Sequence, residues 1–274
     1  MSNTVLFFGD SNTRGYGVGR HDRYAAVAET LLRGDCGDTW QFVVGSSMSD
    51  FRVITDRLAA ALTKHAPRIV VFQCPTGPAS FFVNYPLWVT TPRRAYRRLL
   101  DRLREHYVRV EVSRTQRSRY DVVYDGHYLN RLHLWKPWHL PGLLTVRRWL
   151  VRRHGTVAKT TGDRYVELVC RLRDGWLAQT PVVLFLGLLP SSDEYYPGYA
   201  QRAAQWGAGL TTALHQPSAS RFYLDVHGPL TRGGTRQLLL RDGTHLSVEA
   251  HRQLAALVVP ELRRLMQVCD EGHA

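Results

Sequence analysis

Five short apolar runs recur along the chain, and segments with helical spacing of apolar residues lie between most of them. Runs of this length, rich in Val, Ile, Leu and Phe, are typical of strands buried on both faces. Strands that alternate with helices favour a parallel sheet covered by helices on both sides. We therefore predict an α/β fold with about five parallel strands and a site at their carboxyl ends. The predicted strands are residues 4–8, 40–44, 68–72, 182–186 and 222–226.

The segments between these strands predict the helical layers of the fold. Asp50 is a plausible N-cap for the second of the helices, since its carboxylate can accept from a backbone N–H in the first turn. We expect loops at residues 187–197 and 227–246. A length of 274 residues and a hydrophobic content of 44% suit one sizeable domain. The predicted helices are residues 24–32, 50–65, 165–177, 199–214 and 248–266.

A long basic segment interrupts this alternation between the third and fourth predicted strands. Residues 92–158 carry 16 Lys and Arg against 5 Asp and Glu, so they hold +11 of the net charge of +13. The segment is far longer than an ordinary connection in an α/β domain. Insertions over the carboxyl edge of a sheet commonly form a lid or a partner surface. We therefore predict a main domain of residues 1–83 and 160–270 with a basic, aromatic-rich insertion at 84–159.

Two polar segments near the ends of the chain carry residues suited to nucleophilic catalysis. Ser11 directly follows the first apolar strand in a glycine-rich turn, where its hydroxyl can be exposed. A serine hydroxyl is a weak nucleophile and needs a base within hydrogen-bonding reach. Asp242 and His245 lie three residues apart just before the last predicted helix. This spacing lets the carboxylate orient the imidazole while the second ring nitrogen faces the serine.

Together these segments resemble the SGNH (GDSL-type) hydrolase family. Residues 9–13, Gly-Asp-Ser-Asn-Thr, match the first sequence block of that family, and Asp-x-x-His at 242–245 matches the last. The resemblance implies a flavodoxin-like three-layer sandwich and serine-dependent cleavage or transfer of an acyl group. It also implies that Ser11 is the nucleophile, His245 the general base and acid, and Asp242 the orienting carboxylate.

The same resemblance implies an oxyanion hole with one altered position. The family uses the backbone N–H of the nucleophile, here Ser11, and a glycine N–H after the second strand, where this chain has Gly45. The third donor is an asparagine side chain, but Gly77 occupies its position. Loss of one donor costs about 10²–10³ in turnover. Asn84 or Asn12 is a candidate replacement; otherwise the reaction demands less of this pocket, or the enzyme is slow.

The basic insertion suggests three kinds of partner. Arg93, Arg97 and Arg98 are candidates for binding an anionic substrate, such as a thioester on coenzyme A or on an acidic carrier protein. Interleaved Trp and Arg residues also suit contact with an anionic membrane surface. Binding of single-stranded nucleic acid ranks last because no nucleic-acid module accompanies the arginines. The alternative without a partner is a solvated basic face.

Other polar residues are interpreted as structural. Asp225 and His227, at the end of the fifth predicted strand, resemble a second acid–base pair, but we expect them to support the fold. His127, His133 and His139 recur every six residues, which does not by itself create convergent metal ligands. We predict no metal or cofactor. With no CxxC pair, no long apolar segment and no basic leader, we expect a cytoplasmic protein with free thiols.

The preferred function is a serine-dependent hydrolase that cleaves an ester or thioester through an acyl-enzyme. One alternative is an acyltransferase that delivers the acyl group to an alcohol or amine in a biosynthetic pathway. A long insertion that excludes water from the site would favour that outcome. Another alternative is a non-catalytic binding protein on a decayed hydrolase fold. The oligomeric state is open.

Overall fold

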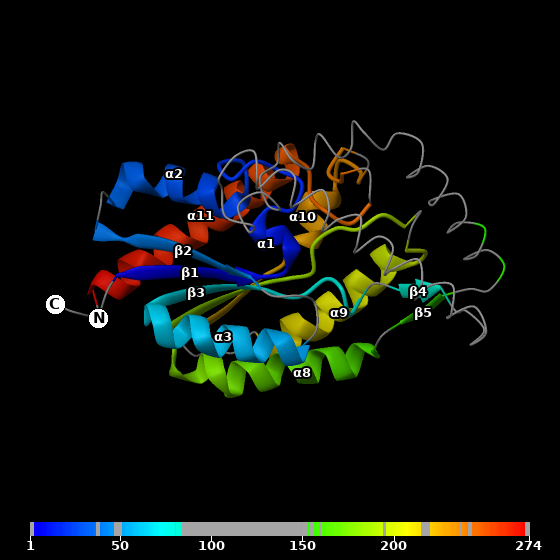
Figure 1. The fold of residues 1–274 in the computed structure, drawn as a ribbon, viewed down its shortest axis with the longest axis horizontal. Helices are drawn as coiled ribbons and strands as arrows, with labels where there is room; N and C mark the ends of the chain where they lie inside the picture. The colour runs from blue at the N-terminus through cyan, green and yellow to red at the C-terminus, as the bar shows by residue number, and fades with distance from the viewer. Residues whose placement is uncertain are drawn as a thin grey trace, which may run out of the picture.

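A computed structural model describes most of the chain outside the basic segment. Five strands form one parallel sheet in the order β2-β1-β3-β6-β7 (Figure 1). This is the flavodoxin-like strand order, so the predicted fold class is confirmed. The strands are β1 Thr4–Gly9, β2 Gln41–Ser46, β3 Ile69–Gln73, β6 Val182–Leu186 and β7 Arg221–Leu224. The described residues are 3–36, 39–46, 51–79, 81–83, 149, 153, 156–158, 160–193, 196–214, 220–235, 237–240 and 243–271.

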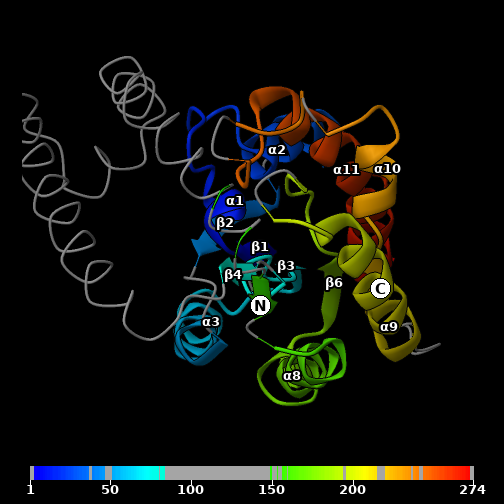
Figure 2. The same cartoon turned by 90° about the vertical axis from the view of Figure 1, so that its right-hand side faces the viewer.

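Helices cover both faces of the sheet and complete a three-layer sandwich (Figures 1 and 2). Val5 and Phe7 of β1 pack in one core cluster, whereas Leu6 and Phe8 pack in the other. This alternation follows from the two-residue period of a strand. It explains why both the odd-numbered and the even-numbered residues of β1 are apolar. On the first face lie α2 (Tyr24–Cys36) and α11 (Val248–Glu271); on the second lie α3 (Phe51–His65), α8 (Gly162–Asp174) and α9 (Tyr199–Leu214).

Several short elements differ from the prediction. The segment 227–246 was expected to be a loop, but it begins with the short helix α10, His227–Thr231. The prediction of a loop was wrong at this point. Proline is tolerated in the first turn of a helix, so Gly228 and Pro229 do not prevent α10 from forming. A 3-10 helix, η3 (Trp176–Gln179), forms where the α8 segment was expected to continue. The helix α1, Ser11–Arg14, follows β1 directly.

A small antiparallel ribbon stands beside the carboxyl ends of the main strands (Figure 1). It pairs β4 (Phe81–Val83) with β5 (Thr156–Ala158), and Val83 lies opposite Thr156. The ribbon therefore brings together the chain on either side of residues 84–155. The division into a main domain and an insertion stays a prediction.

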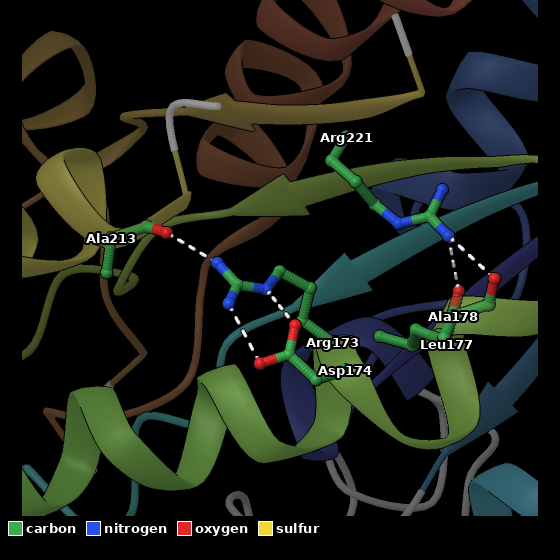
Figure 3. Close-up of polar contacts among 6 residues, drawn as sticks. All are labelled: Arg173, Asp174, Leu177, Ala178, Ala213 and Arg221. Atoms are coloured by element: carbon green, nitrogen blue, oxygen red, sulfur yellow. Dashed lines mark hydrogen bonds and ion pairs between the residues drawn. The ribbon is translucent and has the colours of Figure 1, made fainter. Parts of the chain in front are cut away.

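Arginines anchor helix ends at the amino ends of the strands. Arg173 donates to the carbonyl oxygen of Ala213, in the last turn of α9, at 2.6 Å (Figure 3). Arg221 donates to two carbonyl oxygens of η3, at 2.9 and 3.0 Å (Figure 3). Arg68 donates to a carbonyl in the last turn of α11. Carbonyls in the last turn of an α-helix have no partner within it, so Arg173 and Arg68 supply donors there. The Leu177 oxygen, which Arg221 binds, also accepts the backbone N–H of Thr180.

The helices and the thiols of the same described ranges set two further properties of the fold. Within them, no helix combines the length and apolarity that a membrane span requires. Cys74 and Cys269 are buried free thiols, and Cys170 is a half-buried one. Burial raises the pKa of Cys74, so this thiol stays protonated at neutral pH.

Candidate active site

Ser11 and His245 meet at the carboxyl ends of the strands although they are 234 positions apart in sequence. Ser11 is the first residue of α1, and His245 lies in the loop that precedes α11. The Oγ of Ser11 is 2.8 Å from Nε2 of His245, and both side chains are partly buried. This is the distance of a good hydrogen bond between a nucleophile and its base.

Asp10 fixes the turn that presents Ser11. Its Oδ1 accepts the backbone N–H of Asn12 at 2.9 Å and so caps α1. Its Oδ2 accepts the backbone N–H of Thr76 at 3.0 Å, which ties this turn to the loop after β3. Asp10 is itself buried, and the two N–H groups that donate to its oxygens offset the cost of removing the carboxylate from water. The direction of α1 is thus set from two neighbouring strands.

Gln73, the last residue of β3, binds the same turn from the strand next to β1. Its Oε1 accepts the backbone N–H of Asp10 at 3.0 Å and the hydroxyl of Thr13 at 3.1 Å. A Cβ atom at Gly9 would lie only 2.6 Å from this oxygen, so the close approach requires glycine. The sequence interpretation did not single out Gln73. The available signal was a polar residue at the end of an otherwise apolar strand.

A second set of contacts positions the His245 loop. The Oδ1 of Asn12 accepts the backbone N–H of Leu246 at 2.9 Å, which links the residue after the nucleophile to the residue after the base. The Tyr16 ring lies on the His245 imidazole, with centroids 4.3 Å apart and planes inclined by 35°. Gly17, at φ 86°, allows this turn to pack against Leu240, where a side chain would overlap. The side-chain oxygen Oδ1 of Asn12 therefore positions the His245 loop.

The remaining oxyanion candidates lie in different settings. Gly45 is inside β2, opposite Phe8 in the register, and a Cβ atom there would lie 2.8 Å from the Phe8 ring. Packing alone is thus a sufficient reason for glycine at this position. Gly77 lies in the turn after β3, next to the Thr76 amide that binds Asp10. Predicted site residues outside the described residues are Asp242, Asn84, Arg93, Arg97 and Arg98, as are His127, His133 and His139.

Asp225 and His227 are joined by a local hydrogen bond that supports the turn into α10. Asp225 Oδ1 accepts the backbone N–H of His227 at 3.1 Å at the start of α10. Burial lowers the pKa of the His227 imidazole, and the negative charges of Asp225 and Asp193 partly oppose that shift. Within the described ranges, no group of three or more His, Cys, Asp or Glu side chains converges as metal ligands do.

His251 is a buried histidine on the first turn of α11. Its Nδ1 accepts the backbone N–H of Tyr24 at 3.2 Å, and its buried Nε2 has no hydrogen-bond partner among the residues that the structure describes. Burial lowers the pKa of His251 to about 3, and the nearby charge of His245 acts in the same direction. The imidazole is therefore neutral at physiological pH and joins the start of α2 to α11.

The structure combines a three-layer α/β fold with a serine–histidine pair at the carboxyl edge of its sheet. The serine follows the first strand, and the histidine precedes the last helix. This is the fold of the SGNH (GDSL-type) hydrolases, which the sequence blocks at 9–13 and 242–245 resemble. No family model and no curated protein sequence matches the chain.

Solved structures share this fold at low sequence identity. The crystal structure of TesA has a TM-score of 0.52 and 17% identity, covering 96% of this chain and 99% of TesA. A mutant of Axe2, an acetylxylan esterase from Geobacillus stearothermophilus, has a TM-score of 0.54 and 13% identity, covering 94% and 93%. LAE5, an alpha/beta hydrolase enzyme from the Lake Arreo metagenome, has a TM-score of 0.55 and 12% identity, covering 94% of each chain. At such identities the likeness concerns the fold.

Proposed function

We propose that this protein is a serine-dependent acyl hydrolase that cleaves an ester or thioester through an acyl-enzyme. The observation that carries the proposal is the 2.8 Å contact between Ser11 Oγ and His245 Nε2 at the carboxyl edge of the sheet. The shared fold with an acetylxylan esterase and a further hydrolase supports the same reaction class. Fold alone does not fix chemistry, so the serine–histidine geometry is the stronger argument.

The reaction follows from the positions of these two side chains. As Ser11 Oγ attacks the acyl carbonyl, His245 Nε2 accepts its proton and then donates that proton to the departing alkoxide or thiolate. Water, deprotonated by His245, next attacks the acyl-enzyme and releases the acid. Asp242 is assigned to orient His245 through the other ring nitrogen. The contacts of Tyr16 and Leu246 supply further support for the imidazole loop.

The oxyanion of the tetrahedral intermediate needs donors near Ser11. The first N–H groups of a helix have no acceptor within it, so the backbone N–H of Ser11 is assigned as one donor. The Asp10–Thr76 bond holds the turn containing Gly77 against the Ser11 turn, which favours a backbone N–H from that turn as a second donor. Gly45 is the alternative. Without an asparagine side chain, we expect turnover about 10²–10³ below that of a complete hole.

A fluorophosphonate probe combined with ester hydrolysis tests this function. Wild-type protein should be labelled and should hydrolyse p-nitrophenyl butyrate, whereas Ser11→Ala and His245→Ala should fold and do neither. Ser192→Ala is the matched control, because the Ser192 backbone N–H keeps its 2.8 Å bond to the Gly243 carbonyl. A folded wild type that is neither labelled nor active would overturn the proposal and favour a non-catalytic protein.

Hydrolysis and acyl transfer are separated by adding acceptors to the same assay. Release of free acid at an unchanged rate in the presence of alcohols and amines supports hydrolysis. Formation of the new ester or amide in place of free acid would instead identify an acyltransferase, for which the Ser11–His245 pair would serve equally well.

A further inference from the structure

The ring of Tyr16 lies on the imidazole of the proposed catalytic base. The two ring centroids are 4.3 Å apart, and the inclination of 35° between the planes is closer to stacked than to edge-on. A positive charge within about 6 Å of an aromatic centroid is attracted by the electron-rich face of the ring. Both side chains are half-buried, so this attraction is screened less than it would be in bulk water. The contact therefore has the geometry to act on a charged His245.

A helix-ending motif ties Tyr16 to the proposed nucleophile. Gly15 ends α1 in the left-handed conformation, at φ 78°, and its N–H donates to the carbonyl oxygen of Asn12 at 3.0 Å. The N–H of Tyr16 then donates to the carbonyl oxygen of Ser11 at 2.9 Å. These two bonds form a Schellman motif, which fixes the residue after the left-handed glycine relative to the helix. The backbone of Tyr16 is thus positioned by Ser11.

The residue on the other side of Tyr16 contacts the loop of His245. Gly17 also has a left-handed backbone, at φ 86°, and a Cβ atom there would overlap a methyl group of Leu240. The N–H of Leu240 donates to the carbonyl oxygen of His245 at 2.7 Å. The backbone around Tyr16 is therefore fixed on one side by the residue of the nucleophile and on the other by the loop of the base.

The proposed reaction gives the His245 ring a positive charge. As the bond between Ser11 Oγ and the acyl carbon forms, the serine proton moves to Nε2 and the imidazole becomes an imidazolium. The charge is lost when that proton passes to the departing alkoxide or thiolate. Nε2 faces Ser11 at 2.8 Å, and Nδ1 is assigned to Asp242. The neighbouring His251 is neutral and does not oppose the charge. With both nitrogens assigned, the face of the imidazolium is where a further side chain can stabilise it.

We propose that Tyr16 is a positioning residue that holds the His245 imidazole and stabilises its imidazolium form through the face of the phenol ring. The attraction to a charge exists only while the imidazole is protonated, so it lowers the barrier without tightening the binding of substrate. Tyr16 acts on the reacting atoms only through His245. This inference rests on the proposed hydrolase function and assigns one further residue to it.

Replacement of Tyr16 separates the ring face from the hydroxyl. Tyr16→Leu keeps an apolar side chain without a π face, so kcat and kcat/KM for p-nitrophenyl butyrate should both fall about tenfold, with KM within about twofold of wild type. Tyr16→Phe keeps the face and should hold kcat within about threefold of wild type. Phe222→Leu is the matched control on β7, where the guanidinium carbon of Arg264 lies 4.7 Å from the ring centroid. This control also removes a ring that faces a cation, and it should leave kcat unchanged.

A fluorinated series at position 16 gives a measurement that packing does not move. Fluorine withdraws electron density from the ring face and barely changes the size of the ring, so it weakens the attraction for a cation. Starting from Tyr16→Phe, mono-, di- and trifluorophenylalanine should lower log kcat steadily, to about a tenth of the starting kcat for the trifluoro residue. The same series at Phe222 should leave kcat unchanged. Because the ring shape is kept, this series decides the question even if Tyr16→Leu does not fold.

The outcomes separate this inference from the proposed function. Ser11-dependent hydrolysis with a kcat that fluorination at position 16 does not change would overturn the role of the ring face and leave the hydrolase. Equal losses in Tyr16→Phe and Tyr16→Leu would overturn it as well, because the hydroxyl would then be the group required. A loss carried by KM alone would place Tyr16 against the substrate and would also contradict the inference. A folded wild type without Ser11-dependent hydrolysis would refute the proposed function, and the inference with it.

Discussion

Acid should destabilise this fold through His251. The folded imidazole is buried with a pKa of about 3, against an ordinary value of 6.5 for an exposed histidine. Above pH 6.5 both the folded and the unfolded states are neutral at this position. As the pH falls below 6.5, only the unfolded chain takes up the proton, so the free energy of unfolding decreases until the folded pKa is reached.

The size of the effect follows from these two pKa values. Between pH 7 and pH 5 the unfolded histidine gains a proton while the folded one stays neutral, which removes about 2 kcal/mol of stability. His251→Asn retains an acceptor for the Tyr24 N–H but cannot titrate. The stability advantage of wild type over this variant should therefore shrink by about 2 kcal/mol on going from pH 7 to pH 5.

Urea denaturation followed by tryptophan fluorescence at the two pH values measures this difference. Leu254→Ala is the control on the same helix, since Leu254 is fully buried and apolar. Leu254→Ala should lower the free energy of unfolding by about 2–5 kcal/mol because it leaves a cavity, and this loss should be equal at both pH values. The reasoning is refuted if the difference between wild type and His251→Asn is the same at pH 7 and pH 5.

Three other substitutions test the supports of the site and the fold. Asn12→Ala removes the acceptor of the Leu246 N–H and should lower kcat for an ester at least about tenfold through a displaced His245 loop; an unchanged kcat would show that the loop is held without it. Gln73→Leu leaves the buried turn before Ser11 without its acceptor and should lower the free energy of unfolding by at least about 2 kcal/mol, so a neutral urea midpoint would contradict that role. Arg221→Lys replaces a fork that spans two carbonyls and should cost about 1–2 kcal/mol in the same assay; a cost near zero would mean that the anchor contributes little.

The fold was predictable because its strands are short, apolar and separated by amphipathic helices. Those patterns depend on local sequence, and each predicted strand in the sheet appears within a few residues of its expected place. The placement of Ser11 and His245 followed from the ends of the same elements, since the carboxyl ends of parallel strands meet at one edge.

What sequence reasoning missed depends on contacts between distant residues. Gln73 can bind the turn before Ser11 because β1 and β3 are neighbours in the sheet. The residues that flank Gln73 in sequence do not reveal that pairing. The role of Asn12 depends on a loop that returns 234 positions later. Arg173 and Arg221 belong to no motif, yet each binds a specific carbonyl of a distant segment.

The β4–β5 ribbon brings two distant points of the chain side by side. Val83 and Thr156 are partners across the two strands, so the chain leaves and re-enters the described structure at adjacent positions. Closing a longer loop at such a point adds only about 0.6 kcal/mol for each doubling of its length. A two-residue Asn-Gly turn could close the same ribbon as a hairpin. With its ends held next to each other by this ribbon, the connecting segment can change in length at a small entropic cost to the fold.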